Sequence, residues 1–266
     1  MRVWPVAKLT LLQGVKERFF IGMLVAELLL LAASYYLSQL APGDSVKVAM
    51  DFALSFVTLL VAFFAAAFTT ATLFKDLNEK FVYLVLSRPV SRSDYLGGKL
   101  LGIFLTLLLF LVISYALTGI AFIVYSWLIP LYTPHPVLLG RLLLFFLELF
   151  FMSVLLASFT VFISLLFTSQ TLALAVAVLG FFAGLELSAV KEIVNGSPFV
   201  SAFNRAVVNA VYYFYPNFSL FDFKSAVVHL GVEVHSPFFL LTALYSLLYS
   251  GALFLASTFL FSRREL

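Results

Sequence analysis

Six long apolar stretches constrain this chain more than any other feature of its sequence. They cover residues 19–40, 52–74, 100–128, 142–167, 171–189 and 238–261. A helix that crosses the hydrocarbon core of a bilayer needs roughly 20 apolar residues, and each stretch meets that test. The runs show no alternation of period two, which argues against a transmembrane barrel. We therefore expect an all-α, polytopic membrane protein with six transmembrane helices.

The composition excludes a soluble globular protein. Hydrophobic residues make up 63% of the 266 residues and charged residues 11%, whereas soluble domains average about 45–50% and about 25%. The chain contains no cysteine, which excludes disulfides, thiolate metal sites and a cysteine nucleophile. The first apolar stretch is too long for the core of a signal peptide, so we expect a retained anchor and one transmembrane domain over residues 1–266.

The basic residues predict the orientation of the spans. Five lie on one side of the predicted membrane: Lys47, Arg141, Lys191, Arg205 and Lys224. The other eleven lie in the N-terminal tail, the 75–99 connection and the C-terminus. Because Lys and Arg concentrate in cytoplasmic segments, both termini are expected in the cytoplasm, with the chain in the cytoplasmic (inner) membrane. The same bias explains the net charge of +3, so no nucleic-acid partner is needed.

The N-terminal tail, residues 1–18, has the pattern of an amphipathic helix. Val6, Leu9, Leu12 and Val15 recur at helical spacing, with polar residues between them. Such a helix fits the inner surface of the bilayer. The alternative is an ordinary basic flank of the first span.

The connection at residues 75–99 is the most distinctive polar segment. Leu77, Phe81 and Leu84 have the spacing of a short surface helix. Pro89 should end that helix, and Ser91 with Asp94 three residues later predicts the start of another. The segment is either a docking element for a cytoplasmic partner or a solvated loop that sets topology.

Three acidic residues fall inside predicted spans, where a charge is costly: Glu27, Glu148 and Glu186. Each is either part of a polar lining or gate, or the acceptor of one structural interhelical hydrogen bond. Small residues mark two spans for close packing. The second contains Thr69 and Thr70 after three alanines, and the fifth contains Gly180-x-x-x-Gly184.

Neither an ATPase site nor another catalytic site is predicted. Gly98-Lys99 is followed by Leu100, which fails the phosphate-binding loop pattern. We therefore expect a chain that is not an enzyme and holds no cofactor. His135, His229 and His235 fall in external segments, but without tight spacing they indicate surface histidines rather than a copper or zinc site. No metal site is predicted.

The external segment, residues 190–237, is too long for a simple turn. Its turn cluster and its run of Val, Ala and Tyr predict short helices at the outer leaflet. The segment either caps the pathway or contacts an external partner.

Two motifs resemble a known family. Glu79, Tyr83, Leu86, the run Arg88 to Arg92, Tyr95 and Gly98-Lys99 resemble the signature after the second span of ABC-transporter permeases of the second integral-membrane class. The likeness is greatest to the nitrous-oxide-reductase copper-maturation (multicopper enzyme maturation) group. The stretch from Tyr215 to Lys224 resembles a Pro-Asn…Phe-Asp stretch before the last span of that group. Lys80 and Phe81 follow Glu79 where many members have Gly-Thr.

The resemblance implies a permease that dimerises, forming a homodimer that binds two copies of a separate ATPase, which holds the ATP and Mg²⁺. It implies that 75–88 is the main coupling helix and that 168–170 is the second contact. The candidate coupling residues are Asp76, Glu79, Tyr83, Arg88, Pro89, Arg92, Lys99 and Ser169. The candidate path or gate residues are Glu27, Thr69, Thr70, Glu148, Gly180, Gly184 and Glu186. The candidate residues of the external loop are Tyr215, Pro216, Asn217 and Asp222.

The sequence therefore predicts an export permease that converts ATPase closure into alternating access. One alternative is an ATPase-driven mechanotransmitter that acts on an external accessory protein. Another is a standalone channel or membrane enzyme. Copper or sulfur species, lipids, glycans and peptides all remain open as substrates, because function is determined by the site and not by the fold.

Overall fold

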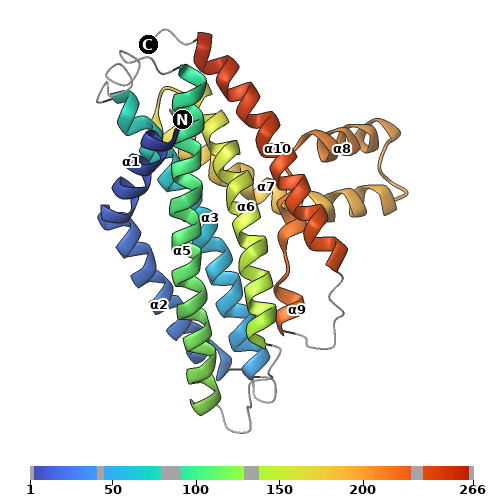
Figure 1. The fold of residues 1–266 in the computed structure, drawn as a ribbon. Helices are drawn as coiled ribbons and strands as arrows, with labels where there is room; N and C mark the ends of the chain where they lie inside the picture. Colours follow the sequence, from blue (N-terminus) through green and yellow to red (C-terminus); the bar gives the residue numbers. More distant parts are fainter. Residues whose placement is uncertain (1–2, 41–44, 79–90, 129–137, 229–235, 264–266) are drawn as a thin grey trace.

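The chain forms a bundle of long helices in the computed structural model, which describes residues 3–40, 45–78, 91–128, 138–228 and 236–263 (Figure 1). Six helices of these residues are long and apolar enough to cross a membrane, and the described part contains no strand. The all-helical prediction with six spans is confirmed. The spanning helices are α2 (Arg18–Ser38), α3 (Ser45–Asn78), α5 (Arg92–Leu128), α6 (Leu138–Leu166), α7 (Gln170–Gly196) and α10 (Ser236–Arg263).

Both chain termini lie at the same end of the bundle, the upper end in Figure 1. We call it the near end. It also holds the last turn of α3, the first turn of α5 and the tight connection between α6 and α7. The far end holds the last turn of α2 and the first turns of α3 and α6. The 75–99 connection and the 168–170 turn therefore share one end with the termini.

Several helices extend beyond the apolar stretches that predicted them. Residues 75–78, expected to open the surface helix, form the last turn of α3. Residues 79–90, with the rest of that expected helix, lie outside the described residues. An apolar stretch ends at the first charged residues, whereas the backbone hydrogen bonds of the helix continue past them. The helices are therefore longer than the apolar stretches. The start of α5 is as predicted: the backbone N–H of Asp94 donates to Ser91 Oγ at 3.0 Å, which caps the helix.

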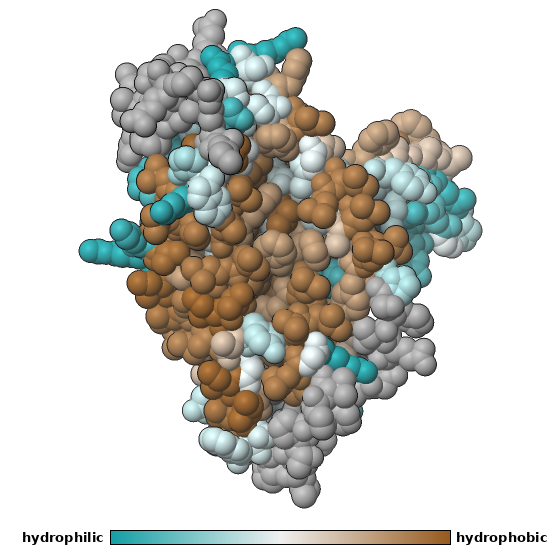
Figure 2. Space-filling view, in the orientation of Figure 1, coloured by the Kyte–Doolittle hydropathy of each residue, from teal (hydrophilic) through white to brown (hydrophobic). Residues whose placement is uncertain are grey.

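The centre of the bundle is formed by α6 and α3. Their most apolar windows are 78% and 61% buried, whereas that of α10 is only 17% buried. Figure 2 shows apolar side chains over the visible flank between the two ends, with polar residues at the near end. A flank of this kind matches the hydrocarbon core of a bilayer.

The N-terminal helix α1 (Val3–Lys16) packs along α5 rather than standing apart from the bundle. Its buried positions are Ala7, Thr10 and Gly14. Only Glu17 separates α1 from α2. The exposed face of α1 carries Trp4 and Lys8 among others, as an amphipathic helix at an interface requires.

The segment between α7 and α10 leaves the bundle and then returns to it. Helix α8 (Ala202–Phe214) pairs with the end of α7 as a hairpin that projects from the side of the bundle in Figure 1. The chain then packs back against α3, α6 and α7 through η1 (Phe218–Phe221) and α9 (Lys224–Val228). Arg141 on α6 holds α9 through a 2.7 Å bond from Nη1 to the carbonyl oxygen of Ala226.

Candidate functional site

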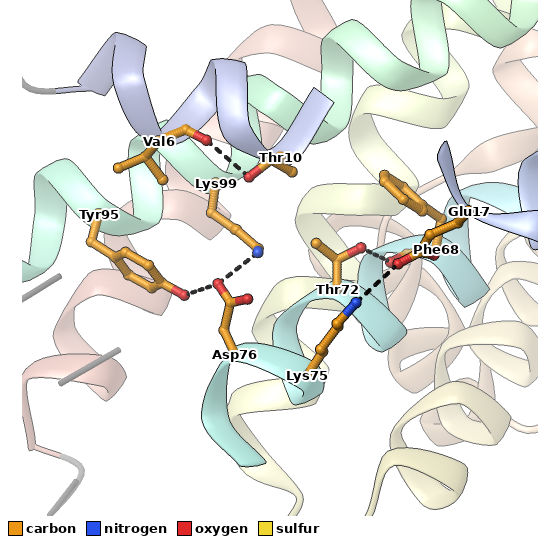
Figure 3. A network of polar contacts seen from close by, with 9 residues as sticks. All are labelled: Val6, Thr10, Glu17, Phe68, Thr72, Lys75, Asp76, Tyr95 and Lys99. Carbon is orange, nitrogen blue, oxygen red and sulfur yellow. Dashed lines mark hydrogen bonds and ion pairs between the residues drawn. The ribbon is translucent and has the colours of Figure 1, made fainter. Parts of the chain in front are cut away.

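The near end contains a buried polar cluster of Asp76, Tyr95 and Lys99, which we call the near-end cluster (Figure 3). The Nζ atom of Lys99 lies 2.6 Å from Oδ2 of Asp76. The Tyr95 hydroxyl donates to the same oxygen at 2.5 Å. Lys99 is 2% exposed and Asp76 is 5% exposed. The cluster therefore joins the last turn of α3 directly to the first turns of α5.

The helix α1 covers this cluster because two glycines on α5 let it approach closely. A Cβ atom on Gly98 would lie 2.7 Å from the carbonyl oxygen of Val3, and one on Gly102 would lie 2.5 Å from Cβ of Thr10. The α5 surface at this point is therefore a notch into which the backbone of α1 fits.

Further contacts tie the neighbouring helices to the cluster. Glu17, at the joint of α1 and α2, lies 3.6 Å from Nζ of Lys75 on α3. The ring of Tyr95 stacks on Phe261 of α10. Arg92 donates through Nη1 to the carbonyl oxygens of Phe261 and Ser262, at 3.0 and 2.8 Å. Helices α1, α3, α5 and α10 thus meet around the two ends of the 79–90 connection.

The Asp76–Lys99 pair is costly to break because both partners are buried. Removing one partner of a buried ion pair leaves an uncompensated charge and costs roughly 3–5 kcal/mol. Replacing both partners by well-packed apolar residues is often neutral. The pair is therefore a strong constraint once it has formed, even though its net contribution to folding is small.

The remaining candidate coupling residues are placed as follows. Glu79, Tyr83, Arg88 and Pro89 lie outside the described residues. Ser169 is half-buried at the near end and precedes the first turn of α7. Asp76, Arg92 and Lys99 face neighbouring helices, as described above.

Two of the acidic path candidates accept interhelical hydrogen bonds. Ser114 on α5 donates to Glu27 Oε2 at 2.6 Å. Thr242 on α10 donates to Glu148 Oε1 at 2.8 Å. Both carboxyls are fully buried. Glu148 accepts this one interhelical bond, whereas Glu27 also accepts from Thr118 on α5 at 3.5 Å, so each carboxyl links two spans.

The small-residue candidates pack inside the subunit. Thr69 and Thr70 are fully buried on α3, and the Thr70 hydroxyl donates to the carbonyl oxygen of Ala66 at 2.8 Å. Gly184 on α7 faces the returning 215–218 segment, and Gly180 faces both that segment and Phe159 of the spanning helix α6. A Cβ on Gly180 would lie 2.7 Å from Oη of Tyr215, and one on Gly184 would lie 2.5 Å from the carbonyl oxygen of Pro216.

The external-loop candidates hold that segment against α7 and α10. Tyr215 donates to the carbonyl oxygen of Gly180 at 2.8 Å, and burial raises the pKa of its hydroxyl, so it stays protonated as a donor. The buried side chain of Asn217 donates to Ser188 Oγ at 3.0 Å and caps η1 by accepting from the Ser219 backbone N–H at 3.1 Å.

Glu186, the third acidic candidate, is exposed at a cavity of about 280 Å³ between α3, α7 and η1. Asp222 also lines this cavity. We call it the Glu186 pocket. Its lining also contains Lys224 and the hydroxyl residues Ser55, Thr58 and Ser219. An apolar cavity of about 210 Å³ lies on the same pair of helices and shares Leu59 with it. We call this second cavity the Phe181 pocket, after one of its lining residues.

A comparison with models of known protein families identifies the family of this chain. The model of the family described as ABC-2 family transporter protein matches residues 4–266. The chain belongs to the ABC-2 transporter family. A search of curated proteins gave no match.

As an ABC-2 family member, the chain is the membrane permease component of an ABC transporter and spans the membrane several times. The family supplies the transport subunit, and a separate ABC ATPase component is its partner. The described helices give this ABC-2 permease two polar regions, the near-end cluster and the Glu186 pocket, at different levels of the bundle.

Sequence reasoning missed part of both regions. Tyr95 belongs to the recognised motif but was not singled out as a site residue. The spacing Gly98-x-x-x-Gly102 is visible in the sequence and could have predicted the notch that receives α1. Ser55 and Lys224 carry no local signal, because only folding brings them next to Glu186.

Proposed function

We propose that this ABC-2 permease is one half of a homodimeric exporter in the cytoplasmic (inner) membrane. Two copies of a separate ATPase bind its near end, which faces the cytoplasm, and supply all the ATP and Mg²⁺ chemistry. The distribution of basic residues supports this orientation. The resemblance of the 79–99 and 215–224 motifs supports placement in the nitrous-oxide-reductase maturation group.

Coupling is assigned to the 79–90 connection together with the turn at Ser169. The observation that carries this proposal is the near-end cluster, which clamps together the two helices that flank the connection. A force applied between these helices is transmitted to α3 and α5 as one unit, since the buried pair resists separation. In this arrangement Asp76 and Lys99 position the coupling segment, and Glu79 and Arg88 touch the ATPase.

The transport route is assigned to the face shared by α3 and α7. Both the Glu186 pocket and the Phe181 pocket are lined by these two helices. Their arrangement gives the face an apolar part and a polar part. Glu27 and Glu148 stabilise the bundle behind it, through their bonds to α5 and α10.

Reconstitution with the partner ATPase tests this function. Glu79→Gln and Arg88→Gln are expected to reduce ATPase assembly or coupled turnover by more than about tenfold, as loss of a central interface contact does. Lys8→Gln, on the exposed face of α1, is the matched control and should leave both unchanged. Full assembly and full turnover in the two test variants would contradict the coupling assignment.

One observation favours a second candidate function, transmission of force to an external accessory protein. The α7–α8 hairpin exposes several aromatic side chains, with Phe199 at 96%, Phe214 at 85% and Phe203 at 75%. A projecting surface of this kind suits a protein partner. Transport assays in sealed vesicles separate the two functions, because force transmission predicts ATP turnover without solute movement.

A further inference from the structure

We propose that the Glu186 pocket binds the primary ammonium group of a single-chain amphiphile. This inference rests on the proposed transport function and names the substrate class for the route along α3 and α7. The pocket is lined by three charged residues, several hydroxyls and an apolar floor, a combination typical of a binding site for an amphiphilic ligand.

The charges of the pocket leave one carboxylate for a ligand. Lys224 lies 3.9 Å from Asp222 and donates to Ser55 Oγ at 3.3 Å, so these two charges largely compensate each other. Glu186 has no ion-pair partner among the described residues. The net charge that the pocket presents is therefore negative, which favours a cation.

The hydroxyl groups of the pocket favour a cation that donates hydrogen bonds. Thr58 donates its own hydrogen to the carbonyl oxygen of Leu54 at 2.8 Å, and Ser219 donates to Asn217 Oδ1 at 2.7 Å. The Thr58 oxygen therefore keeps its lone pairs for the pocket, whereas the Ser219 oxygen also contacts Ser188 Oγ at 2.7 Å and has one lone pair left. Together with the Glu186 carboxylate they form an acceptor set, and a primary ammonium group with three N–H donors is complementary to it. A trimethylated ammonium has no such donors.

The apolar walls define the rest of the ligand. Leu59, Met152 and Phe218 line the Glu186 pocket. Leu59 also lines the neighbouring Phe181 pocket, where nearly all the lining is apolar. The two cavities hold about 280 and about 210 Å³, so they suit one headgroup and part of one alkyl chain.

Photolabelling of the permease alone tests the proposal. The probe is a dodecylamine that carries a diazirine, applied to the full chain in phosphatidylglycerol nanodiscs without ATPase. Label is expected on peptides from α3, α7 and residues 218–224. Dodecylamine should compete at roughly tenfold lower concentration than dodecyltrimethylammonium, and dodecyl sulfate should compete least, because only the primary ammonium donates hydrogen bonds to the acceptor set.

Glu186→Gln should weaken the labelling roughly tenfold, since it removes the uncompensated charge. Glu192→Gln is the matched control, an exposed glutamate on the same helix that does not line the pocket. Leu59→Trp should also weaken labelling, because Leu59 lines both cavities and a larger side chain would fill part of them. The side chains of Glu186 and Leu59 are both exposed, so the Glu186→Gln and Leu59→Trp variants should still fold.

Equal competition by dodecylamine and dodecyl sulfate, or unchanged labelling of Glu186→Gln, would overturn the proposal. A comparison of nanodiscs with and without lysophosphatidylethanolamine, a single-chain lipid with a primary ammonium group, identifies the source of the ammonium. Reduced labelling in its presence supports a lipid headgroup, and unchanged labelling supports a free amphiphilic amine. Because no ATPase is present, failed binding is distinct from failed coupling.

Discussion

The charged side chains in the two polar regions of this permease differ in their burial and in their ion pairing. In the near-end cluster the charges of Asp76 and Lys99 are buried and satisfy each other within the protein. In the Glu186 pocket the carboxylates of Glu186 and Asp222 are exposed, Lys224 is half-buried, and Glu186 has no described ion-pair partner. A buried pair fixes a geometry because breaking it is costly. An exposed charge contributes little to stability and remains available to a ligand.

The largest effect is expected at the near-end cluster. Asp76→Asn or Lys99→Met should lower the free energy of unfolding by roughly 3–5 kcal/mol, because each leaves a buried group without its partner. Thermal unfolding of the purified protein measures the loss. The double variant Asp76→Leu/Lys99→Met should recover much of the stability. Equal loss in the single and double variants would show that the pair itself does not act as a constraint.

The double variant also separates stability from coupling in the assembled transporter. If the directional ion pair is what aligns α3 with α5, the stable apolar variant should still hydrolyse ATP with reduced transport per ATP. If that variant transports as much substrate per ATP as the parent, the cluster contributes packing but not coupling.

A smaller effect is expected where α1 meets α5. Gly102→Ala places a methyl group 2.5 Å from Thr10 Cβ, and overpacking of this kind costs roughly 1–3 kcal/mol. The helix α1 should become more accessible to proteolysis, measured by limited digestion. Gly22→Ala is the control, since a Cβ there meets nothing within 4 Å. It should be neutral or slightly stabilising.

The smallest effect on stability is expected at the Glu186 pocket. Lys224→Gln removes a partly exposed ion pair with Asp222, and such pairs contribute roughly 0–1 kcal/mol. Its melting temperature should stay within about 2 °C of the parent. A loss as large as that of Asp76→Asn would erase the contrast between the two regions and indicate that the pocket is structural.

The apolar stretches are sufficient to predict the six spanning helices, because membrane-spanning length and backbone hydrogen bonding are local properties. The capping of α5 by Ser91 was predictable for the same reason. Contacts between distant residues were not. Asp76 and Lys99 lie in the predicted coupling segment, but no local pattern predicts that they form a buried ion pair.

Small-residue spacing illustrates the same limit. Gly180-x-x-x-Gly184 predicts a close approach, and a close approach exists. Its partners are the returning 215–218 segment and Phe159 of α6, which periodicity cannot identify because a glycine pair accepts any surface of suitable shape. Gly98 and Gly102 make an equivalent notch for α1. The sequence thus locates such notches more readily than it names what fills them.

The segment between α7 and α10 is attached to the bundle through its main chain at two points, in addition to the side-chain bonds of Tyr215 and Asn217. Arg141 binds the carbonyl oxygen of Ala226, and Tyr249 binds that of Phe214. Every residue type presents the same carbonyl oxygen, so these bonds do not depend on the side chains at positions 226 and 214. The segment can therefore exchange side chains at these two points of attachment while keeping its attachment to the bundle, which leaves a fixed frame on which chemical selectivity can change.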